Sequence, residues 1–392
     1  MFRVPVLHLP EANPDRSETS MPSSRPPFRA DHVGSLLRPQ ALREARARWQ
    51  AGEIDRSALA AVEDRAIRDV IALQESAGLQ SVTDGEFRRT AWHLDFLTGF
   101  EGIDATGEGY AVSFKSADGQ VASTSSMLRV TGKITRPKPI MVDHFDFLQA
   151  NTSRTAKFTI PSATYIHMRG GRSVVDATAY PDMDEFWSDL ANAYQQEVAD
   201  LAAAGCTYLQ MDDVSFATIC DENVRERVRA DGENPDDLPT LYTRIVNSMV
   251  ANRPEGMAVT VHTCRGNHRS MWMAEGGYEA VAEAVFSGLE VDGLFLEYDT
   301  NRAGGFEPLR FVPKGRRVVL GLVSSKVAAL EDREQILRRI DEASNYIDVD
   351  QLCISPQCGF ASTEAGNALS EDDEKRKLEL LVDVATQVWG EL

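Results

Sequence analysis

Short apolar runs alternate along the chain with longer segments in which apolar residues recur every three or four positions. The runs have the length and composition of buried β-strands, and the longer segments have the period of amphipathic helices. Eight strands are predicted in this way, at Asp31–Ser35, Gln80–Asp84, Lys157–Ser162, Thr207–Asp212, Ala258–Cys264, Gly293–Glu297, Arg317–Val323 and Gln351–Ser355. Strands that alternate with helices form parallel sheets through crossover connections, so eight such units predict an α/β fold of the (β/α)8 TIM-barrel type.

The segments between the strands carry their apolar residues on one face. In the longest of them, Ile67, Val70 and Ile71 recur at helical spacing. Helices are predicted at Ile54–Gly78, Asp184–Ala204, Leu238–Ala251, Tyr278–Ser287, Arg333–Ala343 and Glu371–Trp389, with an extra one at Pro39–Gly52 after the first strand. Because each helix has one apolar face, we expect the helices to surround the sheet.

Two segments depart from the barrel repeat. Between the second and third strands, residues 102–140 hold two β-rich runs, Tyr110–Phe114 and Met127–Ile134, on either side of a Ser- and Gly-rich middle. They predict a β-hairpin insertion over the barrel mouth, in the place of a lid. Residues 1–27 are rich in Pro and Ser and predict a mobile N-terminal tail. Residues 28–392 are therefore expected to form a single barrel domain.

Composition narrows the class of protein. The 392-residue chain is 43% apolar and carries a formal charge of −19, which argues against nucleic acid or an anionic membrane as a partner and favours small molecules. Its five cysteines are odd in number and irregularly spaced, so they predict free thiols in a reducing cytoplasm. No apolar stretch reaches transmembrane length. The sequence is compatible with a homo-oligomer but leaves the oligomeric state open.

Polar residues follow nearly every predicted strand. Barrel enzymes carry their chemistry at the carboxyl ends of the strands, on one face of the barrel. At those ends the chain has His32–Ser35, Asp84–Glu86, Asp212 with Asp213, His262–Cys264, Glu297–Asp299, Ser324–Lys326 and Gln357–Gly359. A single member, such as Glu86 near Arg88, would equally suit a surface ion pair. The whole set predicts an active site.

Four of these residues predict a metal site. His262, Cys264, Glu297 and Cys358 each end or closely follow a strand-like run, so a barrel brings them to the same end. Zinc prefers imidazole, thiolate and carboxylate ligands in a tetrahedral array, and such a site can hold a further thiolate as a nucleophile. A His-x-Cys pair also arises by chance, and buried cysteine behaves as a small hydrophobic residue. The convergence of all four at strand ends favours Zn2+.

The polar residues at the strand ends resemble those of a known protein family. Over about residues 28–390, this chain resembles the catalytic barrel of cobalamin-independent methionine synthase. The matching residues, in the order in which they follow along the chain, are His32–Ser35, Asp84–Glu86, Leu209–Asp213, His262–Cys264, Glu297 and Pro356–Gly359. The chain is similar to the short relatives that have one barrel. The resemblance implies a cytoplasmic methyltransferase of methionine biosynthesis, in which zinc holds homocysteine as a thiolate and the sulfur takes the methyl group of a methylated folate.

The resemblance also implies roles for individual residues. It makes His262, Cys264, Glu297 and Cys358 the zinc ligands. Because four ligands leave zinc no open position, we expect the hardest of them, Glu297, to yield when the substrate sulfur arrives. The resemblance implies that four residues bind the amino-acid end of homocysteine: His32, Ser35, Glu86 and Asp212. Asp212 is also expected to be a catalytic residue.

The methyl-donor side departs from the family. After the seventh strand the family has a histidine that protonates the leaving folate nitrogen, whereas this chain has Ser324, Ser325 and Lys326. An amine leaves poorly without a proton, so either Lys326 is the catalytic acid or the methyl donor is a different compound. Where the family has a tryptophan that stacks on folate, this chain has Tyr165. His93 is a minor candidate for the pocket, because a histidine in so aromatic a stretch is more often a packed core residue.

Three alternatives to methyl transfer onto homocysteine follow from the same residues. A related zinc-dependent alkyl transfer would use a different donor, or a different thiol or a 2-oxo acid as acceptor. A metal-free barrel similar to uroporphyrinogen decarboxylase would share the fold but leave the four metal-site residues unexplained. A non-catalytic zinc barrel, acting as a sensor or scaffold, would not need Glu86 and Asp212 in an open cleft.

Overall fold

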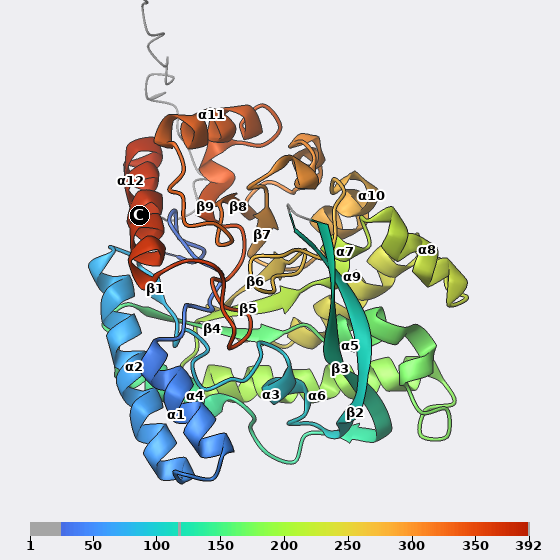
Figure 1. Cartoon of the computed structure of the whole chain (residues 1–392). Helices are drawn as coiled ribbons and strands as arrows, with labels where there is room; N and C mark the ends of the chain where they lie inside the picture. Colours follow the sequence, from blue (N-terminus) through green and yellow to red (C-terminus); the bar gives the residue numbers. More distant parts are fainter. Residues whose placement is uncertain (1–24, 117–118, 391–392) are drawn as a thin grey trace, which may run out of the picture.

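The computed structural model describes residues 25–390 except 117 and 118, so the predicted mobile tail lies almost entirely outside the described residues. Seven parallel strands form one curled sheet with helices around it, in the order β1-β4-β5-β6-β7-β8-β9 (Figure 1). The strands are β1 Ser81–Val82, β4 Thr155–Pro161, β5 Tyr208–Asp213, β6 Ala258–Thr263, β7 Gly293–Glu297, β8 Arg317–Val323 and β9 Leu352–Pro356. The predicted barrel architecture is confirmed, with these strands close to their predicted bounds.

An irregular segment replaces the first predicted strand, Asp31–Ser35. Ala30 makes a single parallel bridge with Ile354 of β9. The carboxylate of Asp31 accepts a hydrogen bond from the N–H of His32 at 2.8 Å, and Gly34 adopts φ +138°, a conformation that other residues rarely adopt. Local bonds of this kind compete with a strand ladder, so the prediction of a regular strand here is wrong.

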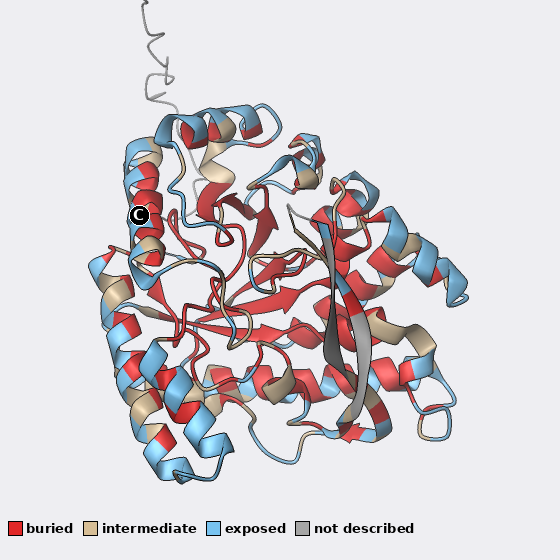
Figure 2. Cartoon of the chain, in the orientation of Figure 1, coloured by how far each residue is buried: buried red, intermediate tan, exposed pale blue. Residues whose placement is uncertain are grey.

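Helices cover the outside of the sheet, with exposed residues on their outer faces and buried residues toward the strands (Figure 2). The predicted helices are α1 Gln40–Gln50, α2 Arg56–Ser76, α6 Met183–Ala203, α9 Leu238–Val250, α11 Arg333–Ala343 and α12 Glu371–Trp389. Several begin at a polar cap: Asp55 accepts from the N–H of Ala58, and Ser370 forms a capping box with Asp373. The predicted helix Tyr278–Ser287 is instead the short α10, Glu279–Ala282, followed by a π-helical turn, Glu283–Ser287.

Short helices that the sequence did not predict occupy the connections. Most are too short to show a helical period in the sequence. They are α3 Leu94–Leu97, α4 Val142–Ala150, α5 Thr164–Gly170, α7 Ser215–Thr218 and α8 Glu222–Ala230, with 3-10 turns at Gly171–Val174, Asn301–Ala303, Glu307–Phe311 and Val349–Gln351. Within the described parts of the chain, no helix is both long and apolar enough to span a bilayer.

The predicted hairpin is present and longer than the two runs that indicated it. Its strands, β2 Glu101–Ser116 and β3 Gly119–Thr135, pair antiparallel and cross in front of the main sheet (Figure 1). Near its tip, the N–H of Lys115 donates to the carbonyl of Trp272 at 2.6 Å, and Lys115 Nζ lies 3.0 Å from a carboxylate oxygen of Asp221. The hairpin is therefore tied to loops at the carboxyl ends of β5 and β6.

The barrel interior combines an apolar layer with one buried ion pair. The layer consists of Val33, Phe295, Val319 and Cys353. Beside it, Lys157 Nζ lies 3.0 Å from Asp31, whose other carboxylate oxygen accepts from the hydroxyl of Tyr208 at 2.7 Å. A buried ion pair needs such additional hydrogen bonds to offset the cost of desolvation. The interior is thus a packed core, and the open space lies at the carboxyl ends of the strands.

Candidate active site

Four potential metal ligands meet at the carboxyl ends of β6, β7 and β9. One ligand atom each from His262, Cys264, Glu297 and Cys358 lies within 4.8 Å of all the others, and all four residues are buried. We call these four residues the metal site. The two sulfur atoms are 3.4 Å apart. Two thiolates on one tetrahedral zinc lie about 3.8 Å apart, so the spacing fits a shared ion.

Strand geometry and loop bonds place these ligands. His262 belongs to β6 and Cys264 follows two positions later, so the strand period directs both side chains to one face. Glu297 ends β7, and the N–H of Arg265 donates to its Oε1 at 2.8 Å. The N–H of Gly266 donates to the Cys264 sulfur at 3.3 Å. The loop after β6 therefore holds ligands on two neighbouring strands.

The electrostatics of the metal site call for a cation. Burial raises the pKa of Glu297, and the neighbouring Cys358 raises it further. The hydrogen bond between the cysteines raises the pKa of Cys264 and lowers that of Cys358. Among the described residues, Glu297 Oε2 has no hydrogen-bond partner. A zinc ion would satisfy this oxygen and both sulfurs, and the donor set fits zinc.

A cavity of about 290 Å3 opens beside the metal site. It brings together three of the metal-site residues, the predicted residues Ser35, Glu86 and Asp212, and a set of aromatic residues from other elements. The lining includes Ser35, Glu86, Trp92, His93, Phe114, Tyr165, Arg169, Asp212, His262, Cys264, His268, Met273 and Cys358. This volume suits a small molecule next to the metal.

Two carboxylates face the cavity from neighbouring strand ends. Across the β5–β6 ladder, Asp212 pairs in register with His262, and burial raises the pKa of Asp212 to about 7. Glu86 follows β1 and accepts from the hydroxyl of Thr159 at 2.9 Å, while its Oε2 has no hydrogen-bond partner among the described residues. Burial also raises the pKa of Glu86. Two buried carboxylates with raised pKa values would be stabilised by a cationic ligand.

Ser35 joins this side of the cavity through a tight contact with the loop after β9. A methyl group added to Gly359 would come 1.9 Å from Ser35 Oγ, so only glycine fits beside Cys358. The N–H of Phe360 donates to the carbonyl of Ser35 at 2.8 Å. The predicted substrate-binding serine and the last predicted metal ligand are therefore packed against each other.

An aromatic wall forms another side of the cavity. The ring centroid of His93 lies 4.4 Å from that of Tyr165 and 4.8 Å from that of Trp92. Burial, together with the charge of Arg169, lowers the pKa of His93 to about 3, so the imidazole is neutral at physiological pH. The sequence favoured a core position for His93, and it identified neither Trp92 nor Arg169, because nothing in the local pattern shows that this loop turns toward the cavity.

Two residues predicted to be catalytic or to bind substrate lie outside the cavity lining. Lys326 is buried, and its Nζ donates to the carbonyl of Gly266 and to Asn267 Oδ1 at 3.2 and 3.1 Å. It supports the loop after Cys264, and its predicted acid role stays a prediction. His32 is buried beside Lys157 and does not line the cavity, and burial lowers its pKa to about 4. Its predicted contact with substrate likewise stays a prediction.

Comparisons with known proteins agree on one family. The family described as the catalytic domain of cobalamin-independent synthase matches residues 28–387. An uncharacterized protein of Bacillus subtilis (strain 168), YxjH, is 44% identical over 365 residues, which cover 93% of this chain and 95% of that protein.

Two further matches carry descriptions of activity. A solved structure from Listeria monocytogenes, described as a candidate vitamin-B12-independent methionine synthase, is 34% identical with a TM-score of 0.73, covering 93% of this chain and 99% of that one. A 5-methyltetrahydropteroyltriglutamate–homocysteine methyltransferase of a Synechococcus strain is 25% identical, covering 86% of this chain but 40% of that longer protein.

Proposed function

Because this methyltransferase chain belongs to the cobalamin-independent methionine synthase family, we propose that it methylates the thiol of homocysteine at a zinc ion bound by the metal site. The observation that carries the proposal is the convergence of two thiolates, an imidazole and a carboxylate within 4.8 Å at the edge of a cavity that also contains Asp212 and Glu86. The family membership leaves no support for the decarboxylase-like alternative.

Zinc, when bound, would keep the substrate thiol ionised at neutral pH and therefore nucleophilic. The chain's own residues would hold the rest of the substrate. In the proposed complex, Asp212 and Glu86 accept hydrogen bonds from the ammonium group of homocysteine, and the Ser35 hydroxyl donates to its carboxylate. Charge-assisted hydrogen bonds of this kind would hold homocysteine in one orientation, with its sulfur atom at the metal site and directed toward the methyl donor.

We propose that the methyl donor lies against the aromatic wall of Trp92, His93 and Tyr165. Flat or cationic groups bind well to aromatic faces. The amine of Lys326 donates to Gly266 and Asn267 instead of lining the cavity. This geometry favours, as a second candidate, transfer from a methylated donor whose leaving group needs no proton from Lys326.

The test is direct methyl transfer. Zinc-loaded full-length protein would be incubated with homocysteine and, in separate reactions, 5-methyltetrahydrofolate or S-methylmethionine as donor, and methionine would be measured by mass spectrometry. We expect methionine in at least one reaction. The variant Cys358→Ser should abolish it, whereas Cys220→Ser, which changes a half-buried cysteine outside the metal site, should not. Absence of methionine with every donor would refute homocysteine methylation.

A further inference from the structure

The loop that carries Glu86 is held in an unfavourable conformation. Glu86 adopts φ +62°, in the left-handed region that non-glycine residues rarely occupy. Its N–H donates to Asp84 Oδ1 at 2.9 Å, and its side chain is fixed by Thr159 at 2.9 Å. A strained residue persists only where the surroundings over-determine it, and such residues concentrate at functional sites.

Arg38 supplies part of that restraint and also reaches the loop after Cys358. Its Nη2 donates to the carbonyls of Glu86 and Arg89 at 3.0 and 3.1 Å. Its Nη1 donates to the carbonyls of Ala361 and Thr363 at 2.9 and 3.3 Å. One planar guanidinium therefore joins the loop that carries a proposed substrate ligand to the loop that carries a proposed metal ligand, which a lysine could not do in the same way.

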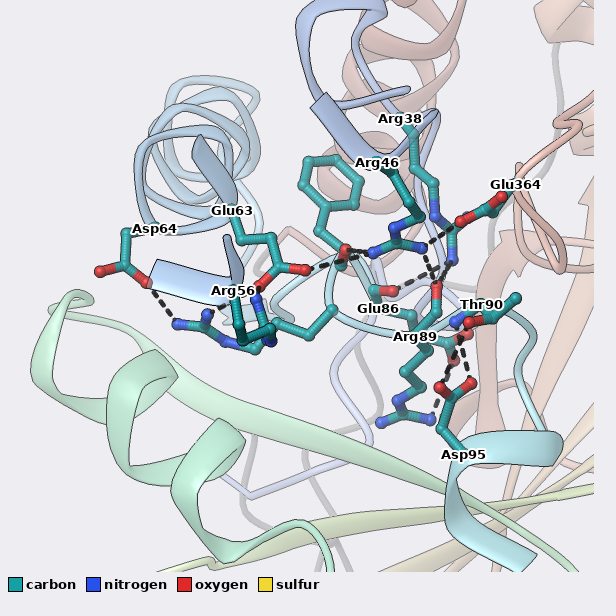
Figure 3. Close-up of polar contacts among 12 residues, drawn as sticks. Arg38, Arg46, Arg56, Glu63, Asp64, Glu86, Arg89, Thr90, Asp95 and Glu364 are labelled. Atoms are coloured by element: carbon teal, nitrogen blue, oxygen red, sulfur yellow. Dashed lines mark hydrogen bonds and ion pairs between the residues drawn. The ribbon is translucent and has the colours of Figure 1, made fainter. Parts of the chain in front are cut away.

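Neighbouring side chains hold the first of these loops from the outside. Figure 3 shows Arg38 and Arg46 side by side, with both guanidinium groups directed at the loop around Arg89. Arg46 donates to the carbonyls of Phe87 and Arg89, both at 2.7 Å, and pairs with Glu63 at 3.4 Å. Arg38 and Arg46 are each only 5% exposed. Buried charge-assisted hydrogen bonds of this kind define one loop position.

Arg38 also follows directly on the Ser35 segment. The same stretch of chain thus supplies Ser35 to the cavity, packs it against Gly359, and then uses Arg38 to tie together the loops on either side. Arg38 itself is absent from the residues that line the cavity. Among the described residues, its hydrogen bonds are accepted by backbone carbonyls, which suits a residue that sets positions instead of touching substrate.

We propose that Arg38 is a positioning residue that sets the separation of Glu86 from Cys358, and thereby makes the site selective for thiols that carry an amino-acid end. The inference rests on the proposed function, because it assumes that a thiol binds at the metal site while its ammonium group reaches Glu86. A thiol without charged groups needs only the metal site. Loss of Arg38 should therefore weaken homocysteine binding and leave a simple alkane thiol unaffected.

The experiment compares two thiols on zinc-loaded full-length protein by titration calorimetry. Homocysteine is the charged ligand, and 1-propanethiol is the matched ligand without the amino-acid group. The variants are Arg38→Lys and Arg38→Ala. Arg48→Ala is the control, because Arg48 lies in the last turn of the neighbouring helix α1 and its side chain forms an exposed ion pair with Glu53. Zinc content and thermal melting would be recorded for each.

For both Arg38 variants we expect the Kd of homocysteine to rise by about tenfold or more, while that of 1-propanethiol changes by less than about twofold. Guanidinium chloride at millimolar concentration should restore homocysteine binding to Arg38→Ala by filling the vacated site, with no effect on Arg48→Ala. If Arg38→Ala does not fold, the ratio of the two Kd values in Arg38→Lys decides the question.

Suppose that the wild type prefers homocysteine and that the Arg38 variants keep the same ratio of the two Kd values. This result would overturn the role of Arg38 and leave the proposed function intact. An equal loss of affinity for both thiols would also overturn it, because a general structural role would weaken the metal site itself. A wild-type chain that binds neither thiol would refute the proposed function, and this inference with it.

Discussion

Replacement of Asp212 by asparagine tests the amino-acid side of the proposed site. Asp212 is 7% exposed, and its Oδ1 accepts from Gln210 Nε2 at 2.7 Å. Asparagine keeps the shape, and its carbonyl oxygen can keep the bond to Gln210. Its amide nitrogen would then replace the carboxylate oxygen that is proposed to face the ammonium group, so an attraction becomes a contact between two donors.

The magnitude follows from the burial of this carboxylate. Removing one partner of a buried, hydrogen-bonded charge pair costs about 3 kcal/mol of binding free energy, within a broad range. Glu86 stays in place and keeps part of the attraction, since it reaches the cavity from another strand end. We therefore expect the Kd of homocysteine to rise by about 100-fold in Asp212→Asn.

Titration calorimetry with zinc-loaded protein would measure this change, with 1-propanethiol as the ligand that lacks the charged groups. The control variant Asp64→Asn changes a partly exposed aspartate that pairs with Arg88 and does not line the cavity. We expect the control to bind both thiols as the wild type does. Unchanged homocysteine affinity in Asp212→Asn, or an equal loss for 1-propanethiol, would refute the assignment of Asp212 to the ammonium group.

Three further predictions concern the hairpin, the Ser35 contact and pH. Lys115→Met, which removes the 3.0 Å pair with Asp221, should increase hydrogen exchange at residues 113–116 and lower kcat/KM a few-fold; unchanged exchange would contradict the tether. Gly359→Ala would put its methyl group 1.9 Å from Ser35 Oγ, so we expect a loss of about 2 kcal/mol in the free energy of unfolding by urea titration, and normal stability would contradict this packing. Burial raises the pKa of Glu374 from 4.5 to about 8, so the folded state holds its proton more tightly and stability falls as pH rises between these values. Glu374→Gln should therefore melt at a higher temperature than the wild type at pH 9 but not at pH 5. Equal melting temperatures at pH 9 would contradict this prediction.

The metal site could be predicted from the sequence because strand ends are fixed by simple periodicity. His262 and Cys264 lie two positions apart at the end of an apolar run, and the period of a β-strand sends both to one face. Glu297 ends the next strand in the sheet, so parallel order brings it alongside. No knowledge of the loops was needed to place these three ligands together.

Side-chain positions in the loops could not be predicted from the sequence, because contacts between separate segments decide them. Lys326 follows a strand, as predicted, but the loop turns its amine toward Gly266 and Asn267. His93 lies in an aromatic stretch that is typical of a packed core, yet the loop after β1 presents its side chain to the cavity. The left-handed conformation of Glu86 has no local sequence signal, and the arginines that hydrogen-bond the carbonyls of Glu86 and Phe87, Arg38 and Arg46, come from a separate segment.

The first strand shows how side chains override a backbone pattern. Asp31 to Ser35 has the polarity expected of a strand end, but Asp31 uses its carboxylate on the neighbouring backbone and on Lys157. The π-helical turn Glu283–Ser287 likewise interrupts a segment with a regular helical period. In both places the local geometry differs from the one that propensity alone predicts.

The proposed mechanism depends most on the metal. The most direct test is elemental mass spectrometry of the full chain, purified without added metal or chelator, together with Cys358→Ser and the control Cys220→Ser. We predict about one zinc ion per chain in the wild type and in Cys220→Ser, and a large loss in Cys358→Ser. A wild-type chain that contains no zinc, and takes none up when zinc is added, would contradict the zinc-dependent mechanism.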